Sequence, residues 1–285
     1  MEIKASQVKE LRDMTGVAMM ECKKALVECQ GDIEKSLDLL RSNSALKAEK
    51  KAARVAADGV LRVHVGDEYS TLIEINSETD FAAKDDNFIK FADDVQKFIS
   101  ENKLTDIADI QASDVEDKRK ALVQTIGENI QLRRLETIEY SSEINASSYL
   151  HSDSKLGSIV VISGGDEALA KDIAMHVAAF NPLCLSEADI DPQILEREKA
   201  IYMVQAEESG KPQEIMEKMI EGKLKRFLSE VSLLSQNFVK DPEVSIQNLL
   251  DSNNAKIQSY TRLKVGEGIE VETKNFADEV AEQLK

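Results

Sequence analysis

The stretch Glu74-Ile-Asn-Ser-Glu-Thr-Asp-Phe-Ala-Ala-Lys84 begins like a β-strand and ends like the approach to a helix. Before it, residues 60–65 and 69–76 are rich in β-forming side chains and are separated by a Gly-Asp-Glu turn, which predicts a β-hairpin. After it, apolar residues between 88 and 98 recur at helical spacing. Residues 79–81 therefore lie at a strand-to-helix junction, where a rigid frame can hold side chains outward.

Two interpretations of this junction are compatible with its spacing. In the first, Phe81 packs on the following helix as a hydrophobic staple, and Asp80 caps the chain beside it. In the second, Thr79, Asp80 and Phe81 face outward and contact a partner. Spacing alone favours the first interpretation.

The composition is that of a soluble globular protein. The 285 residues suffice for two or three compact units, and 42% apolar with 31% charged residues is an ordinary balance. The first residues lack the layout of a signal peptide, and no apolar run approaches membrane-spanning length. Three cysteines, an odd number, provide no disulfide framework. We therefore expect a cytoplasmic protein without membrane contact.

The charge is strongly acidic and unevenly distributed. The formal net charge is −17. Residues 1–54 contain 11 Lys and Arg against 9 Asp and Glu, a net of +2, so the remainder carries −19. A protein that neutralises phosphates needs a basic surface, so we expect no direct nucleic-acid binding. The acidic body would suit a basic protein partner, although acidity also favours solubility.

The N-terminal part predicts a small helical unit. Residues 1–42 have the pattern of three short helices with an apolar stripe on each. Met19 and Met20 are adjacent on the second helix, so both cannot point into the core; an adaptable surface contact and a partly buried filler remain equally open. Residues 42–57 are basic and alanine-rich, and we interpret them as a solvated helical linker.

A repeat follows the linker and sets the fold class. Each copy consists of a hairpin, two helices and a strand, and residues 129–134 resemble residues 255–260. This order predicts an α+β fold in which helices cover one face of an antiparallel sheet in each copy. The second copy is interrupted by two apolar-striped helical stretches that meet at a Ser-Gly-Lys-Pro turn, which predicts an antiparallel coiled-coil arm. Residues 275–280 begin a short amphipathic C-terminal helix.

These patterns divide the chain into five parts. The expected parts are an N-terminal domain with its linker (1–54), a first core subdomain (55–142), a second core subdomain (143–186 and 232–268), the arm (187–231) and a C-terminal module (269–285).

Residue patterns for enzymatic chemistry are missing from the sequence. The three histidines, His64, His151 and His176, are far apart, and none has a His or Cys at metal-ligand spacing. The pair Gly210-Lys211 is followed by proline and lacks the upstream glycine of a phosphate loop. We therefore expect no catalytic residues, no metal site and no cofactor.

Two motifs resemble those of a known family. Residues 74–81 closely resemble the second signature of bacterial elongation factor Ts. The first signature resembles residues 11–16 and continues through residues 22–26, and the likeness extends to residues 265–269. The sequence departs from the family's usual pattern at Ala18, where Gly or Ser is usual, and at Ala82, where Val is usual.

The resemblance implies both a fold and a function. It implies a bundle of the ubiquitin-associated type at the N-terminus, a pair of similar core subdomains, and an arm used in self-association and partner contact. The implied function is guanine-nucleotide exchange: the protein binds the GDP-bound GTPase elongation factor Tu, ejects GDP, and has no chemical turnover of its own. The assembly would be a homodimer through the arm or a heterotetramer with the GTPase.

The resemblance also assigns partner-contact residues. Asp80 and Phe81, with Thr79 beside them, would approach the Mg²⁺ site of the GTPase. The other implied contacts are His151 in the second subdomain, Lys23 with the neighbouring Met19 and Met20 in the N-terminal domain, and Val239. Lys240 stands where the residue after Val239 is usually apolar. The alternative function is a non-enzymatic adaptor or chaperone-like binding protein, and a hydrolase built from scattered carboxylates is a weaker third.

Overall fold

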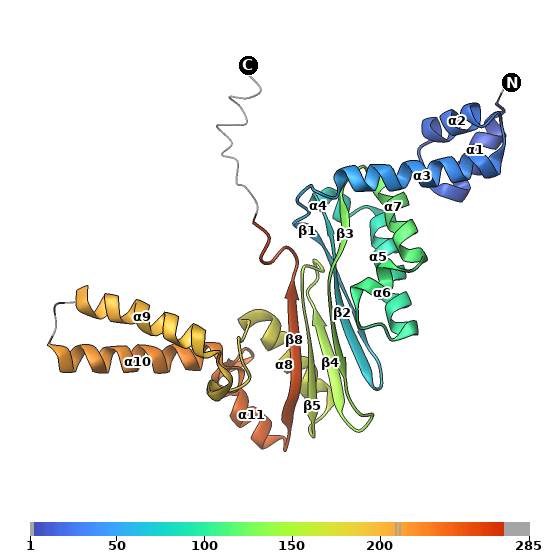
Figure 1. Cartoon of the computed structure of the whole chain (residues 1–285). Helices are drawn as coiled ribbons and strands as arrows, with labels where there is room; N and C mark the ends of the chain where they lie inside the picture. The colour runs from blue at the N-terminus through green and yellow to red at the C-terminus, as the bar shows by residue number, and fades with distance from the viewer. Residues whose placement is uncertain (1–2, 209, 211, 271–285) are drawn as a thin grey trace.

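The N-terminal unit is a bundle of three helices. In this computed structural model, which describes residues 3–208, 210 and 212–270, the bundle lies beyond one end of the core (Figure 1). Its helices are α1 (Ala5–Thr15), α2 (Met19–Glu28) and α3 (Ile33–Lys51). Leu11, Leu26 and Leu40 are almost fully buried between them. Gly16 ends α1 with a φ of +67°, a conformation that glycine adopts without steric cost.

The third helix continues into the predicted linker and is packed there. We expected a solvated helical linker over residues 42–57, but α3 runs without a break to Lys51 and packs against α7. Ser44 and Ala48, one turn apart, are only 4% and 3% exposed. Ser44 hydrogen-bonds Gln124, and the Lys51 ammonium donates to the Gly127 carbonyl. The small side chains allow the two helices to approach closely, and this part of the linker is therefore packed rather than solvated.

The first half of the core is a three-stranded antiparallel sheet with helices on its outer face. The strand order is β1-β2-β3, and α5, α6 and α7 lie on one side of the sheet (Figure 1). The elements are β1 (Asp58–Val65), β2 (Tyr69–Ser77), α4 (Asp80–Ala83), α5 (Asp86–Asn102), α6 (Ile107–Gln111), α7 (Asp114–Ile126) and β3 (Ile130–Glu139).

The second half repeats this arrangement. Its sheet has the order β4-β5-β8, and α8 and α11 pack on it. The elements are β4 (Asn145–Leu150), β5 (Leu156–Ser163), α8 (Glu167–Phe180), α11 (Ile246–Ser252) and β8 (Lys256–Lys264). In both sheets the register slips once, beside Arg133 in β3 and beside Gln258 in β8. The two halves therefore repeat in structure. When they are aligned on these slips, Asn129 corresponds to Asn254, whereas the likeness in the sequence aligns Asn129 with Ala255.

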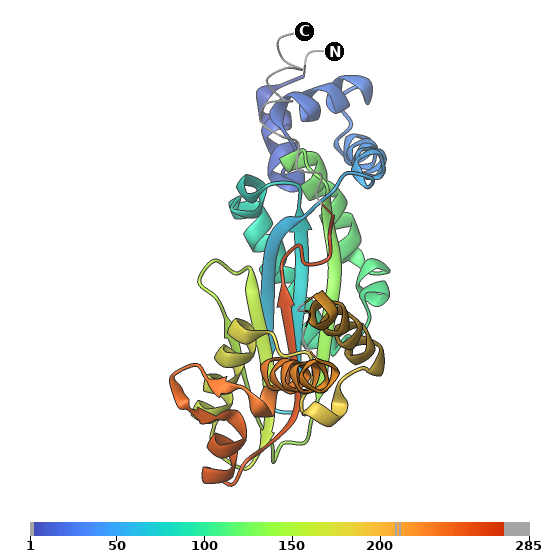
Figure 2. The ribbon, with the colours of Figure 1, turned by 90° about the vertical axis from the view of Figure 1, so that its left-hand side faces the viewer.

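The two sheets pack face to face. Leu61 and Leu72 of the first sheet meet Ile159 and Val161 of the second in a shared apolar layer. Gly157 permits this contact, since a Cβ there would lie 3.3 Å from the side chains of both Leu61 and Leu72. Helices, sheet, sheet and helices therefore form four layers, and the fold is α+β as predicted. The view in Figure 2 shows the bundle at the end of this elongated core.

The arm is a pair of antiparallel helices that projects from the second half (Figure 1). It consists of α9 (Pro192–Glu208) and α10 (Gln213–Val231), entered through the 3₁₀ turn η1 (Glu187–Asp189) and left through η2 (Leu233–Ser235). Main-chain hydrogen bonds close its base: Leu183 N–H donates to Val231 O at 2.8 Å, and Leu233 N–H donates to Cys184 O at 2.9 Å. A short hairpin, β6 (Asn237–Phe238) with β7 (Asp241–Ser245), leads into α11. The helix predicted at 275–280 lies outside the described residues.

Candidate functional site

Phe81 projects from a short, capped helical turn. The side chain of Thr79 accepts the Ala82 N–H at 3.3 Å and so begins α4. Ala82 and Ala83 are buried and anchor the turn against the sheet. Phe81, on the opposite side, is 82% exposed. The interpretation of Phe81 as a hydrophobic staple is therefore wrong, because the side chain covers almost none of the helix that follows.

Asp80 is exposed next to this phenylalanine and is paired on its own helix turn. The Lys84 ammonium donates to the Asp80 carboxylate at 2.7 Å. This hydrogen bond lowers the pKa of Asp80 and raises the pKa of Lys84. Both groups are therefore charged at neutral pH, and the turn presents an aromatic ring beside an ion pair.

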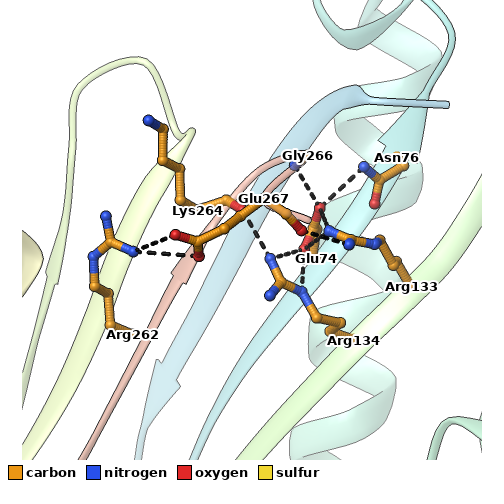
Figure 3. Close-up of polar contacts among 8 residues, drawn as sticks. All are labelled: Glu74, Asn76, Arg133, Arg134, Arg262, Lys264, Gly266 and Glu267. Atoms are coloured by element: carbon orange, nitrogen blue, oxygen red, sulfur yellow. Dashed lines mark hydrogen bonds and ion pairs between the residues drawn. The ribbon is translucent and has the colours of Figure 1, made fainter. Parts of the chain in front are cut away.

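The strand that leads to the turn is anchored by a buried carboxylate. Glu74 is fully buried, and its carboxylate accepts hydrogen bonds from Arg133 Nη1 at 2.9 Å, Arg134 Nε at 2.6 Å, Asn76 Nδ2 at 3.0 Å and Gly266 N at 2.8 Å (Figure 3). The arginines also reach main-chain carbonyls just beyond β8 and at its last residue. Glu74 thus ties the first sheet to the end of the last strand of the second.

The second candidate segment, the turn between β4 and β5, lies beside the first strand. His151 is exposed there, and its Nδ1 lies 2.9 Å from the Tyr149 hydroxyl. The Leu61 N–H donates to Ser154 O at 2.7 Å, and Lys155 pairs with Asp58 at 2.7 Å. Asp58 faces Ser77 in the β1–β2 ladder. The structure therefore brings the His151 turn and the Phe81 turn to the same end of the double sheet.

The remaining candidates lie elsewhere. Met19 and Met20 are 50% and 64% exposed on α2, so both methionines are surface residues, and Lys23 is exposed one turn later. Val239, in the β6–β7 turn, is half-buried against the core of the second half. Lys240 next to it pairs with Asp172 at 2.6 Å. The candidates thus occupy separate elements rather than one pocket.

Two acidic residues near the Phe81 turn were not singled out from the sequence. Glu128 accepts hydrogen bonds from both the N–H and the hydroxyl of Thr79, at 3.0 and 2.7 Å. Glu78 accepts the Asn129 N–H at 2.6 Å. In so acidic a chain neither carboxylate is conspicuous, and the pairing becomes visible only when β3 is placed beside β2.

Across residues 3–208, 210 and 212–270, no group of three or more His, Cys, Asp or Glu side chains is arranged to hold a metal ion. Within the same part of the chain, each helix is too short or too polar to cross a membrane.

Comparisons with known proteins agree on one family. The family model "Elongation factor TS" matches residues 78–267. The chain is 50% identical over 285 residues to elongation factor Ts of Hahella chejuensis, covering 99% of each chain. It is 48% identical over 289 residues to that of Francisella tularensis subsp. novicida, again covering 99% of each. It is 45% identical to that of Thioalkalivibrio sulfidiphilus, with 100% of this chain and 99% of the relative covered.

Proposed function

The chain belongs to the elongation factor Ts family of translation elongation factors, and from this premise we propose that it is the guanine-nucleotide exchange factor of the GTPase elongation factor Tu. It binds the GDP-loaded GTPase in the cytoplasm and promotes the release of GDP. It contributes binding energy and no chemical turnover, metal or cofactor of its own.

One observation carries this proposal: an aromatic side chain that is 82% exposed stands on a braced turn at the family's signature stretch. Exposed aromatic residues on rigid elements are typical anchors of protein interfaces. Little conformational freedom of the turn remains to be lost when Phe81 binds, because the turn is already capped and its alanines are already packed. In this proposal Phe81 enters the GTPase near its Mg²⁺ site, and the Asp80 carboxylate disturbs the charges there.

Exchange of this kind follows from reciprocal coupling. GDP affinity in such GTPases depends on a phosphate-cradling loop and a bound Mg²⁺. If the protein binds the distorted, nucleotide-poor GTPase more tightly than the GDP-loaded form, its binding must lower the affinity of the GTPase for GDP by the same factor. When GTP and aminoacyl-tRNA later favour the loaded form, the same coupling displaces the protein.

The other contact residues contribute affinity rather than distortion. We assign Met19, Met20 and Lys23 to one contact, because they share an exposed face of α2. We assign His151 to a second contact beside the Phe81 turn. Val239 is half-buried, so we give it only a peripheral role.

The arm provides the surface proposed for self-association. Several apolar side chains on it are 40–56% exposed: Ile201, Met203, Val204 and Ile215. A homodimer that buries this surface and a heterotetramer with the GTPase both agree with it. Sedimentation of the protein alone and with elongation factor Tu distinguishes these assemblies.

The proposed function is tested by mixing the protein with elongation factor Tu that carries fluorescent GDP. We expect GDP release to accelerate and to saturate with protein concentration. Binding without acceleration would replace the exchange function with the adaptor or chaperone-like alternative. Hydrolysis of a substrate by the isolated protein would overturn its non-enzymatic character.

A further inference from the structure

Beyond the end of the β2–β3 ladder, two acidic side chains continue the connection between the strands. The ladder ends at Ser77, so Glu78 and Thr79 follow it on one side, and Glu128 and Asn129 precede it on the other. Glu78 accepts the Asn129 N–H at 2.6 Å, and Glu128 accepts the Thr79 N–H at 3.0 Å. Carboxylate oxygens thus take the place that main-chain carbonyls hold in a regular antiparallel ladder.

Glu128 also orients the hydroxyl group of Thr79. Thr79 Oγ1 lies 2.7 Å from Glu128 Oε1 and 3.3 Å from the Ala82 nitrogen. An ionised carboxylate only accepts hydrogen bonds, so the hydroxyl proton must point to Glu128, which leaves the oxygen's lone pairs for the Ala82 N–H. Glu128 therefore fixes the cap of α4, a four-residue helix that is too short to be stable alone.

We propose that Glu128 is a positioning residue for nucleotide exchange: it holds Thr79 so that Phe81 meets the GTPase in one orientation. This inference rests on the proposed function. Glu128 does not need to touch the GTPase, since its two hydrogen bonds act through the residue that begins the Phe81 turn. Displacing a functional side chain by about 1 Å can lower a rate by up to about 100-fold, so losing the hydrogen bonds that position Phe81 should slow exchange measurably.

The same loops connect the Phe81 turn to the N-terminal bundle. Asn129, which is 1% exposed, donates through Nδ2 to Ala52 O at 3.3 Å and to Arg54 O at 2.8 Å. Arg54 in turn pairs with Glu78 at 3.5 Å. The chain that follows α3 is therefore held by the loop that holds Thr79. In this arrangement the acidic pair of Glu78 and Glu128 keeps the bundle and Phe81 in a fixed relation.

The inference is tested in the full-length protein with Glu128→Ala and Glu128→Gln. Fluorescent-GDP release from elongation factor Tu is measured over a range of protein concentrations, to separate the maximal rate from the half-saturating concentration. We expect the maximal rate to fall about tenfold or more with Glu128→Ala and less with Glu128→Gln, which keeps one acceptor oxygen. The half-saturating concentration should change little, because the other contacts remain. Amide hydrogen exchange of residues 79–83 should be faster in both free variants.

Glu136→Ala is the matched control, because Glu136 is exposed on the neighbouring strand β3 and its loss should leave both readouts unchanged. A wild-type protein that does not accelerate release would overturn the proposed function. Wild-type acceleration with unchanged maximal rates in both Glu128 variants would overturn the positioning role alone. A lower rate without faster exchange of residues 79–83 would also overturn it, since Glu128 would then contact the GTPase directly. If Glu128→Ala does not melt cooperatively, the maximal rate and the hydrogen exchange of Glu128→Gln decide whether Glu128 has the positioning role.

Discussion

Truncation of Phe81 to alanine distinguishes a core residue from an exposed contact, because the first would lose stability and the second would lose exchange activity. Loss of a buried phenylalanine costs about 3–5 kcal/mol of stability. Phe81 is 82% exposed, so we expect Phe81→Ala to leave the melting temperature nearly unchanged. GDP release from elongation factor Tu should slow at least about tenfold, because an aromatic interface anchor is worth about 2 kcal/mol or more. Thermal melting and stopped-flow fluorescence measure the two effects.

Phe88→Ala is the control for that experiment. Phe88 is fully buried in the helix behind the turn, so its truncation should lower the melting temperature strongly. If Phe81→Ala destabilised the protein as much as Phe88→Ala does, with normal exchange for each folded molecule, Phe81 would be structural and the exchange mechanism would fail.

Glu74 makes stability depend on pH in a defined direction. Burial alone would raise the pKa of Glu74, but the hydrogen bonds from Gly266, Arg133, Asn76 and Arg134 outweigh burial, so the pKa lies below its ordinary value. Its contribution to stability is therefore fully present above the unfolded-state pKa and is lost as the pH falls through the lower folded-state pKa.

We expect Glu74→Gln to destabilise the protein at pH 7, because it leaves two arginines without their buried carboxylate. Removing one partner of a buried ion pair costs about 3–5 kcal/mol. Below about pH 4.3 the gap between the variant and the wild type should narrow as Glu74 becomes protonated. Urea unfolding at a series of pH values measures this, with Glu136→Gln as an exposed control. A gap that stayed constant from pH 7 into this acidic range would contradict the assignment.

The sequence predicted the strand-to-helix junction that carries Phe81 but not the direction in which the side chain points. It placed residues 79–81 at a strand end, because the β and helical periodicities meet there. It could not show that Phe81 faces out, since one phenylalanine before a helix has the same spacing in either role. The bracing carboxylate of Glu128 was beyond reach as well, because its partner lies 49 residues away.

Among the elements, the arm can be removed to test whether the core folds without it. Its helices bury little of their own surface, and its base is closed by main-chain hydrogen bonds at Leu183, Cys184 and Val231. We expect a protein in which a short Gly/Ser link replaces residues 193–229 to melt cooperatively, because these bonds and the core are kept. Self-association should weaken, while substantial exchange activity remains. Calorimetry, sedimentation and GDP release measure the three properties; loss of cooperative melting would show that the arm belongs to the core.

The positions of the elements were largely predictable because they depend on local periodicity. The predicted hairpin strands 60–65 and 69–76 differ from β1 and β2 by at most two residues at either end. The expectation that residues 42–57 are solvated was wrong at Ser44 and Ala48. The large apolar side chain in the helical part of this stretch, Leu46, is 53% exposed, and the buried positions carry these small side chains instead. Small residues in a basic stretch do not indicate a buried face until α7 is placed beside them.

For the whole molecule, the sequence predicted two sheets but not that they face each other. All nine residues of β2 are buried, as expected for a strand covered on both faces. The prediction of helices on one face left the other face unassigned. The second sheet covers that other face, and the contact between the two sheets joins residues far apart in the chain.

The charge of the whole chain yields a prediction about RNA. A net charge of −17 opposes binding to phosphates, which depends on basic side chains that release counterions from them. We expect no retention of RNA by the protein alone in a gel shift at physiological salt. Tight retention that weakens as salt is added would contradict this.

The separation of the bundle from the Phe81 turn predicts independent effects of two substitutions. Lys23 lies on α2, and α3, 19 residues or about 28 Å long, extends from the bundle to the core (Figure 1). Lys23→Ala should raise the half-saturating concentration for GDP release without lowering the melting temperature, since an exposed charge contributes little stability. Phe81→Ala should lower the maximal rate.

Because the two side chains share no contact, their effects on the free energy of exchange should add to within about 0.5 kcal/mol in the double variant. Stopped-flow release by the wild type, both single variants and the double variant gives this coupling energy directly. Lys24→Ala, which removes a neighbouring exposed lysine whose ion pair stays within α2, is the control for Lys23. A coupling well above 1 kcal/mol would mean that the bundle and the Phe81 turn act on the GTPase as one contact, through the loops that join them.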